Sequence, residues 1–147
     1  MKVYVLEREQ ELPRPLVEVF AFFSDPGNLE RLTPAWLRLQ ILTPRPIKMA
    51  VGTLIRYRLR LRGIPIRWTS EITHYEPPQR FVDEQRQGPY RLWMHEHDFE
   101  DLGASTLVRD RVHYAVWGGP LVARFLVRPD LERIFEFRRK ALEKIFT

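Results

Sequence analysis

The sequence of 147 residues contains no cysteine, and this absence removes several kinds of chemistry at once. Disulfide bonds, a thiolate nucleophile and cysteine-ligated zinc are all excluded. A glycine-rich phosphate loop is also missing, because Gly118-Gly119-Pro120 is too short and precedes no nucleotide-type strand–helix unit. No serine lies in the setting of a nucleophile elbow. The sequence therefore gives no sign of a redox thiol, a nucleotide-binding loop or a serine hydrolase.

Long apolar runs are equally scarce. No uninterrupted apolar stretch approaches the roughly 20 residues that a membrane-spanning helix needs. Residues 1–13 alternate in character and carry charge, so they lack the apolar centre of a signal peptide. We therefore expect a cytoplasmic protein without stable membrane insertion. With 44% hydrophobic residues, a chain of this length can bury one sizeable core, and we expect a single domain spanning 1–147.

The formal net charge is +5, which permits contact with polyanions. Between Arg56 and Arg62, four arginines alternate with apolar residues, so a strand there would carry all the guanidinium groups on one face. Such alternation is typical of the outer face of a half-buried strand. No aromatic residues interleave on the arginine face to stack bases, so we expect no nucleic-acid partner. Polyanion binding through this face remains a third-ranked alternative.

The order of predicted elements narrows the fold. Residues 2–12 alternate as a strand, and two short helices follow, one beginning at Pro15 and one capped by Asn28. Short turns then separate the predicted strands, so their connections are antiparallel. The six predicted strands cover 36–42, 53–62, 64–75, 81–87, 90–100 and 104–116.

The last segment, 121–145, carries apolar residues at helical spacing, and Pro129 predicts a kink or a restart within it. So much apolar surface has to lie against the sheet. A curved sheet closed by one long helix tends to leave a cavity where side chains do not fill the curvature. We therefore predict an α+β fold in which a curved antiparallel sheet of about seven strands wraps around a long C-terminal helix.

Polar residues are predicted on the concave face of the last two long strands. In 90–100, the two acidic residues near the end place the even positions in solvent, which turns His95 and His97 inward. In 104–116 the inward set includes Asp110. A hairpin that turns near Gly103 brings Asp110 opposite or diagonal to both imidazoles.

Further inward-facing residues complete a candidate ligand site. Asp83 and Gln85 share a face with the apolar anchor Phe81. Burying so many polar groups is costly unless they satisfy one another or a ligand. The candidate ligand-binding residues are Trp68, Asp83, Gln85, Trp93, His95, His97, Phe99, Asp110 and Tyr114.

Three interpretations of this polar group stay open. It is a structural hydrogen-bond network, a ligand site whose groups orient a molecule or transfer protons, or a metal site built on His95-x-His97 and Asp110. No fourth metal ligand is evident, and His–Asp pairs are common without metal. We therefore expect neither a metal ion nor a cofactor.

Several segments together resemble the START/birch-pollen-allergen helix-grip superfamily (SRPBCC), which includes polyketide cyclase/dehydrase-like and coenzyme Q-binding proteins. The resemblance covers essentially the whole chain and follows its order of elements. It implies a deep cavity between sheet and helix, used to carry lipids, hormones or polyketides, or in some branches to catalyse cyclisation or dehydration. The segments that carry it are 28–34 (NLERLTP), 81–89, 93–99, 106–114 and Arg138.

Together these observations favour the binding or transport of a small hydrophobic molecule, such as a lipid, isoprenoid or polyketide-like compound. The alternative is a cyclase or dehydratase-type enzyme in which His95 or His97 acts as general acid or base and Asp110 holds its tautomer. The candidate catalytic residues are therefore His95, His97 and Asp110. The sequence leaves the ligand, the reaction and the oligomeric state open.

Overall fold

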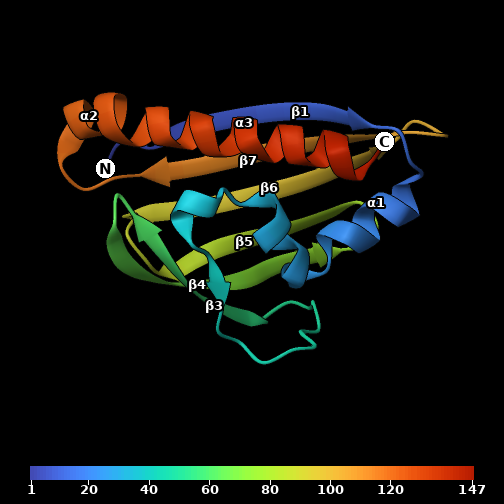
Figure 1. Cartoon of the computed structure of the whole chain (residues 1–147), viewed down its shortest axis with the longest axis horizontal. Helices are drawn as coiled ribbons and strands as arrows, with labels where there is room; N and C mark the ends of the chain where they lie inside the picture. The colour runs from blue at the N-terminus through green and yellow to red at the C-terminus, as the bar shows by residue number, and fades with distance from the viewer.

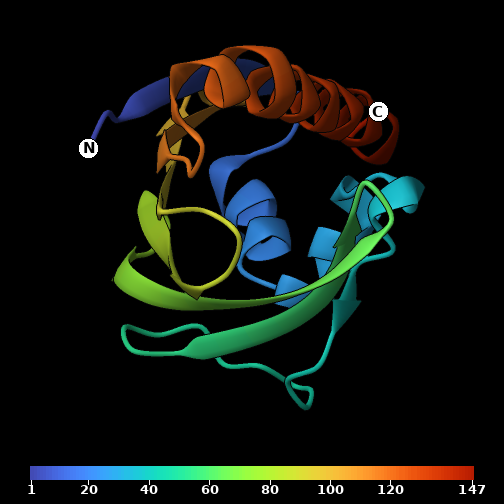
Figure 2. The same ribbon diagram turned by 90° about the vertical axis from the view of Figure 1, so that its left-hand side faces the viewer.

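The computed structural model describes residues 1–147 and contains one seven-stranded antiparallel sheet crossed by a long C-terminal helix (Figure 1). The strands follow the spatial order β1-β7-β6-β5-β4-β3-β2. Seen from one end, the sheet curls around the space beneath the helix (Figure 2). The predicted α+β helix-grip arrangement is thereby confirmed. The strands are β1 (Tyr4–Leu12), β2 (Gln40–Ile41), β3 (Leu54–Leu61), β4 (Ile64–Glu76), β5 (Arg80–Gln87), β6 (Leu92–Asp101) and β7 (Thr106–Ala115).

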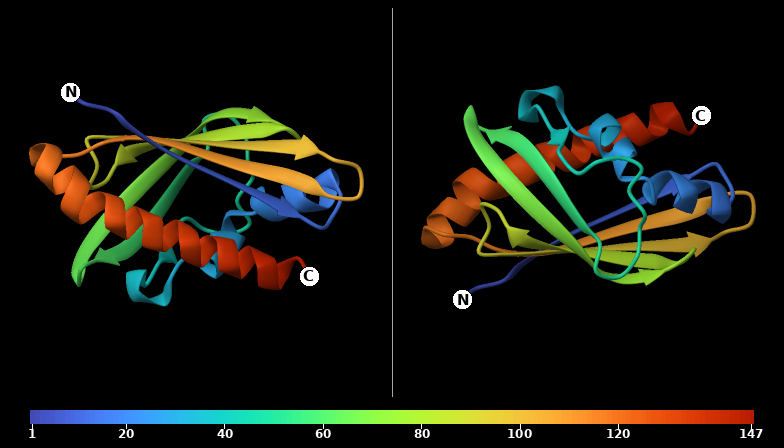
Figure 3. Two further views of the ribbon diagram at one scale, coloured as in Figure 1. Left: turned by 90° about the horizontal axis from the view of Figure 1, so that it is seen from above. Right: turned by 90° about the horizontal axis from the view of Figure 1, so that it is seen from below.

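The helical elements lie before and after the strand meander. They are α1 (Leu16–Phe23), the 3₁₀ helices η1 (Pro26–Leu32) and η2 (Ala35–Leu37), α2 (Gly119–Val122), the π-helical η3 (Ala123–Val127) and α3 (Arg128–Ile145). Views from above and below show that α3 lies across the sheet and that α1 lies near the C-terminal end of α3 (Figure 3). No helix is both long and apolar enough to cross a membrane.

Two details of the N-terminal third differ from the sequence prediction. Asp25, not Asn28, caps the second helix, because its side chain accepts a hydrogen bond from the Gly27 amide. Asn28 lies inside that helix and donates instead to the Phe22 carbonyl. The predicted strand 36–42 shortens to β2, since η2 occupies its first half and Arg38 adopts a left-handed backbone with φ of 47°.

The arginine-bearing strand β3 alternates as predicted. Arg56, Arg58 and Arg60 are exposed, and the residues between them are buried. The fourth arginine, Arg62, lies in the β3–β4 turn with φ of 50° and pairs with Asp130 at 3.1 Å. The outer face of β3 therefore presents three arginines, and the fourth connects the hairpin to α3.

The C-terminal helix continues through Pro129 without a restart. Proline lacks the N–H of an α-helical turn, and its ring crowds the carbonyl four residues earlier. The wider turn of η3 ends at Val127, two residues before Pro129, and accommodates both effects. α2, η3 and α3 therefore follow one another without a gap.

Two apolar clusters fill the space between sheet and helices. The larger includes Phe20, Phe23 and Phe81 and lies against α1 and the end of α3. The smaller includes Leu131 and Phe135 of α3. Polar side chains from the centre of the sheet lie where the two clusters meet, because Phe81 stacks on His97 at 4.1 Å and Phe135 lies 5.7 Å from His95, measured between ring centroids.

Candidate functional site

Five ionisable side chains meet on the concave face of the sheet. The register pairs Asp83 of β5 with His95 of β6, and His97 of β6 with Asp110 of β7. Arg138 reaches the group from α3. The two histidines, Asp110 and Arg138 are each no more than 8% exposed. Charges at such depth are stable only when they compensate one another.

His95, Asp110 and Arg138 form the first part of this group. Asp110 Oδ1 lies 2.8 Å from His95 Nε2 and 3.2 Å from an Arg138 terminal nitrogen, so one carboxylate oxygen accepts from both. Because a carboxylate oxygen only accepts, this bond places a proton on His95 Nε2. In the neutral ring, the other nitrogen, Nδ1, carries the lone pair.

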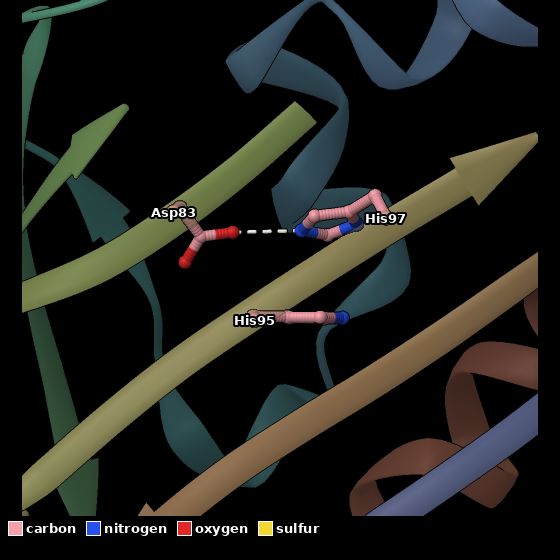
Figure 4. A group of neighbouring side chains, drawn as sticks. All are labelled: Asp83, His95 and His97. Atoms are coloured by element: carbon pink, nitrogen blue, oxygen red, sulfur yellow. Dashed lines mark hydrogen bonds and ion pairs between the residues drawn. The ribbon is translucent and has the colours of Figure 1, made fainter. Parts of the chain in front are cut away.

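His97 and Asp83 form the second part. His97 Nε2 donates to Asp83 Oδ2 at 2.7 Å, as the dashed line in Figure 4 shows. His97 Nδ1 is fully enclosed without a hydrogen bond and lies 3.6 Å from Asp110 Oδ1. The two imidazole rings stack with centroids 3.7 Å apart. The two His–Asp pairs are therefore packed directly on each other.

Burial and charge set the protonation of this group. Burial alone would raise the pKa of Asp110, but the charge of Arg138 and the hydrogen bond from His95 outweigh it and hold that pKa well below its ordinary value. Burial would likewise raise the pKa of Asp83, which the bond from His97 lowers instead. Burial lowers the pKa of His97 to about 4, helped by the neighbouring His95 and opposed by Asp83. Both carboxylates are therefore ionised and His97 is neutral near pH 7.

A cavity of about 220 Å³ lies between the sheet and α3, and most of its lining is hydrophobic. Asp83, His95, His97 and Arg138 contribute to its wall, so the ionisable group forms one polar region of an apolar cavity. Of the four imidazole nitrogens of His95 and His97, only His95 Nδ1 is neither hydrogen-bonded within the chain nor fully enclosed. That lone pair and Asp83 Oδ1, which accepts no hydrogen bond within the chain, are free acceptors in the cavity wall.

The predicted ligand residues divide into two sets. Trp68 and Trp93 line the cavity together with Asp83, His95 and His97. The structure does not place the remaining four in its wall, and Asp110 acts on the cavity only through His95 and Arg138.

Three predicted residues have structural surroundings of their own. Gln85 bonds both backbone groups of Tyr90 and thereby closes the β5–β6 connection. Phe99 packs in the larger apolar cluster, and Tyr114 packs in the smaller one, where it stacks on Tyr4. The inward parity of Phe99 and Tyr114 puts them in the core, because the neighbouring side chains fill the curvature at those two positions.

The sequence pattern assigns no chemical role to two residues of the site. It places Arg138 on the apolar stripe of the last helix, although a charge within such a stripe signals a buried partner. It presents Tyr57 only as an apolar residue between arginines, yet Tyr57 lines the cavity. Burial, with a smaller effect of Asp83, raises the pKa of its phenol above the ordinary value, so the hydroxyl remains protonated.

One set of atoms has the proximity that a metal ion requires. A ligand atom from each of Asp83, His95 and His97 lies within 4.8 Å of the others. Both Nε2 atoms already bond carboxylates, however, and a structural metal site usually takes a fourth protein ligand. A metal ion bound through either Nε2 atom would therefore have to displace one of these hydrogen bonds.

Comparison with known proteins identifies the family. Residues 5–146 match the sequence profile described as polyketide cyclase / dehydrase and lipid transport. The chain belongs to this family. No curated protein matches the chain by sequence.

Solved structures share the fold of this family member across nearly its whole length. The protein TTHA0849 from Thermus thermophilus is 19% identical, with a TM-score of 0.76 over 96% of this chain and 95% of its own. The Zhui aromatase/cyclase from a Streptomyces species is 16% identical, with a TM-score of 0.77 over 97% and 93%. Ginseng major latex-like protein 151 from Panax ginseng is 11% identical, with a TM-score of 0.71 over 98% and 97%.

These neighbours establish the helix-grip fold, and the family establishes the general class of function. This member of the polyketide cyclase/dehydrase and lipid transport family is a hydrophobic-ligand-binding or cyclase-type protein. The choice between those two roles depends on what the ionisable group does in the cavity.

Proposed function

We propose that this protein binds a small hydrophobic molecule in the cavity between its sheet and α3. The observation that carries the proposal is an apolar cavity whose polar region keeps unbonded acceptors, His95 Nδ1 and the second carboxylate oxygen of Asp83. A few placed polar groups in an otherwise apolar pocket are typical of a ligand site, since they orient the ligand that the apolar walls desolvate.

The size of the cavity limits what fits wholly inside. An engineered apolar cavity of about 150 Å³ accommodates benzene. The larger volume of about 220 Å³ suits a molecule of about two fused rings, and a longer ligand would extend out of it. Since His95 Nδ1 accepts a hydrogen bond, the preferred ligand carries a hydroxyl or enol group at one end.

Filling the cavity is expected to weaken binding of a two-ring phenol. Ile134 of α3 is half-buried and lines the cavity, so Ile134→Trp places extra bulk in the void. We expect the affinity for 2-naphthol, followed by its fluorescence, to fall by at least about ten-fold as its contacts are lost. Lys140→Trp, on an exposed position of the same helix, serves as the matched control and should bind as the unmodified chain does. Equal affinity in all three proteins would contradict the proposal.

A second candidate function rests on the His95–Asp110 bond. A carboxylate that orients a histidine and leaves its other nitrogen free toward a bound molecule is the arrangement of a general base. Arg138 holds the same carboxylate ionised. The chemistry that fits is removal of a proton next to a carbonyl group, the first step of an aldol-type cyclisation or a dehydration.

Deuterium exchange separates the two roles. In D₂O the protein is expected to accelerate exchange of the α-protons of a two-ring ketone such as 2-tetralone if His95 acts as a base, and His95→Gln should remove at least about 100-fold of that acceleration. Binding of 2-naphthol by the variant should stay within about ten-fold, since one hydrogen bond is lost. Proton NMR follows the exchange. A chain that binds 2-naphthol yet leaves the exchange rate at the solvent value is a carrier only.

A further inference from the structure

One end of the molecule exposes large apolar side chains next to arginines. Trp117, Leu121 and Phe125 are 64%, 72% and 66% exposed, although all three belong to one short stretch between β7 and α3. Arg91 lies over the Trp117 ring at 5.1 Å, and Arg124 lies over the Phe125 ring at 5.3 Å. We call these five residues the α2 patch. Single exposed apolar residues are ordinary, but a group of this kind marks an interaction surface.

The α2–η3 segment is amphipathic. Leu121 and Phe125, four residues apart, are both exposed, while Ala123 between them is buried at 2% exposure and Val127 packs against the smaller apolar cluster. The segment is therefore anchored by one side and presents the other to its surroundings. No acidic residue occurs from Trp117 to Arg128.

Two connections between strands carry further arginines. The β5–β6 connection contributes Arg91, and the β3–β4 hairpin, which Arg62 connects to α3, carries Arg60 and Arg67 without an acidic residue from 60 to 67. Figure 2 looks at this end of the molecule, where α2 and the β5–β6 connection face the viewer. Exposed aromatic and aliphatic groups among arginines match the interfacial region of an anionic bilayer, where aromatic rings lie at headgroup level and cations meet lipid phosphates and carboxylates.

The same charges disfavour other occupants. A two-fold interface would bring the patch onto its own copy and concentrate arginine charge where the stretch from Trp117 to Arg128 offers no acidic partner. A nucleic acid would leave the aliphatic side chain of Leu121 without a stacking partner. Neither objection applies to a lipid surface.

Along the chain, the cavity wall comes close to the patch at two points. Tyr90, next to Arg91, lines the cavity, and so does Leu131, which follows Phe125 by less than two helical turns. We propose that the α2 patch docks reversibly on anionic lipid bilayers and that the cavity exchanges its hydrophobic ligand there. The inference rests on the proposed function for the source of the ligand, while the docking itself is independent of it.

Vesicle flotation tests the docking. The full chain is mixed with phosphatidylcholine vesicles with or without about 30 mol% phosphatidylserine. The chain should float with the anionic vesicles, and Leu121→Glu/Phe125→Glu should lower its partition coefficient by at least about ten-fold because the inserted apolar surface is lost. The matched control is Val17→Glu/Val51→Glu, which makes the same change at exposed apolar positions elsewhere and should retain the larger part of the binding.

The arginines provide a second, milder set of variants. Arg91→Gln/Arg124→Gln should weaken binding to anionic vesicles by roughly 25-fold, since each arginine near such a surface contributes about five-fold. Arg56→Gln/Arg58→Gln removes the same charge from the outer face of β3 and should have a smaller effect. About 0.5 M salt should weaken binding of the unmodified chain.

Several results would overturn the inference. The first is that the unmodified chain does not float with anionic vesicles, and the second is that the patch variants and their controls lose the same amount of vesicle binding. The third is that Leu121→Glu/Phe125→Glu abolishes self-association or RNA binding and leaves lipid binding unchanged. Binding of 2-naphthol without vesicles keeps the two proposals distinct. A chain that binds 2-naphthol but not vesicles contradicts the docking alone, and one that floats but binds no 2-naphthol contradicts the proposed ligand binding alone.

Discussion

Replacing Arg138 with methionine is expected to lower the free energy of unfolding by about 3–5 kcal/mol, because it leaves the buried Asp110 carboxylate without its permanent counter-charge. The lost energy is mainly the cost of an uncompensated charge, since methionine fills most of the same space. Urea unfolding monitored by tryptophan fluorescence measures it.

A control and a double variant make this prediction specific. Arg139→Met, next in the chain, removes an exposed arginine that pairs with Glu136 and Glu143, and should cost no more than about 1 kcal/mol. Arg138→Met/Asp110→Asn removes both charges and should recover part of the loss. A double variant less stable than Arg138→Met would mean that Asp110 is not the partner that matters.

Stability is expected to depend on pH through His97. Its pKa is lowered from an ordinary 6.5 to about 4 in the folded chain, so the unfolded state binds more protons between those values. The contribution of His97 to stability is therefore complete above about pH 6.5 and is lost as the pH falls toward 4, by of order 3 kcal/mol. Urea unfolding at intervals between pH 4 and 8 follows this change.

His97→Gln should flatten the pH dependence in this window, because the amide still donates to Asp83 but does not titrate. His74→Gln, at an exposed histidine, should leave the dependence unchanged. The lowered pKa values of Asp83 and Asp110 act at lower pH: their contribution is present above the ordinary carboxyl value and is lost as the pH falls through the folded one. A His97→Gln protein with the slope of the unmodified chain would show that another group titrates.

The geometry of the central hairpin follows from the sequence because strand alternation and a short turn leave little freedom. Once Gly103 fixes the turn, His97 opposes Asp110, and the period of two turns His95 to the same side. The same argument placed Trp68 and Trp93 toward the interior, where they line the cavity. Strand alternation and the position of the turn are sufficient for these residues, because they lie on strands of one sheet.

Other features depend on contacts that no local pattern contains. Arg138 meets Asp110 only after α3 has crossed the sheet, and the volume of the cavity depends on how strongly the sheet curves. Parity predicts that Phe99 and Tyr114 face inward but not whether packing or a void surrounds them. The choice of Asp83 as partner of His97 likewise required the β5–β6 register.

The imidazole nitrogens of His95 and His97 give the most direct test that the polar group belongs to a ligand site. With ¹⁵N-labelled protein and increasing 2-naphthol, we predict that the His95 Nδ1 resonance shifts while His97 keeps its proton on Nε2, and that His74 and His113, outside the cavity wall, stay unchanged. If 2-naphthol leaves both inner imidazoles unaltered at saturation, the ionisable group is structural and the proposed binding mode is wrong.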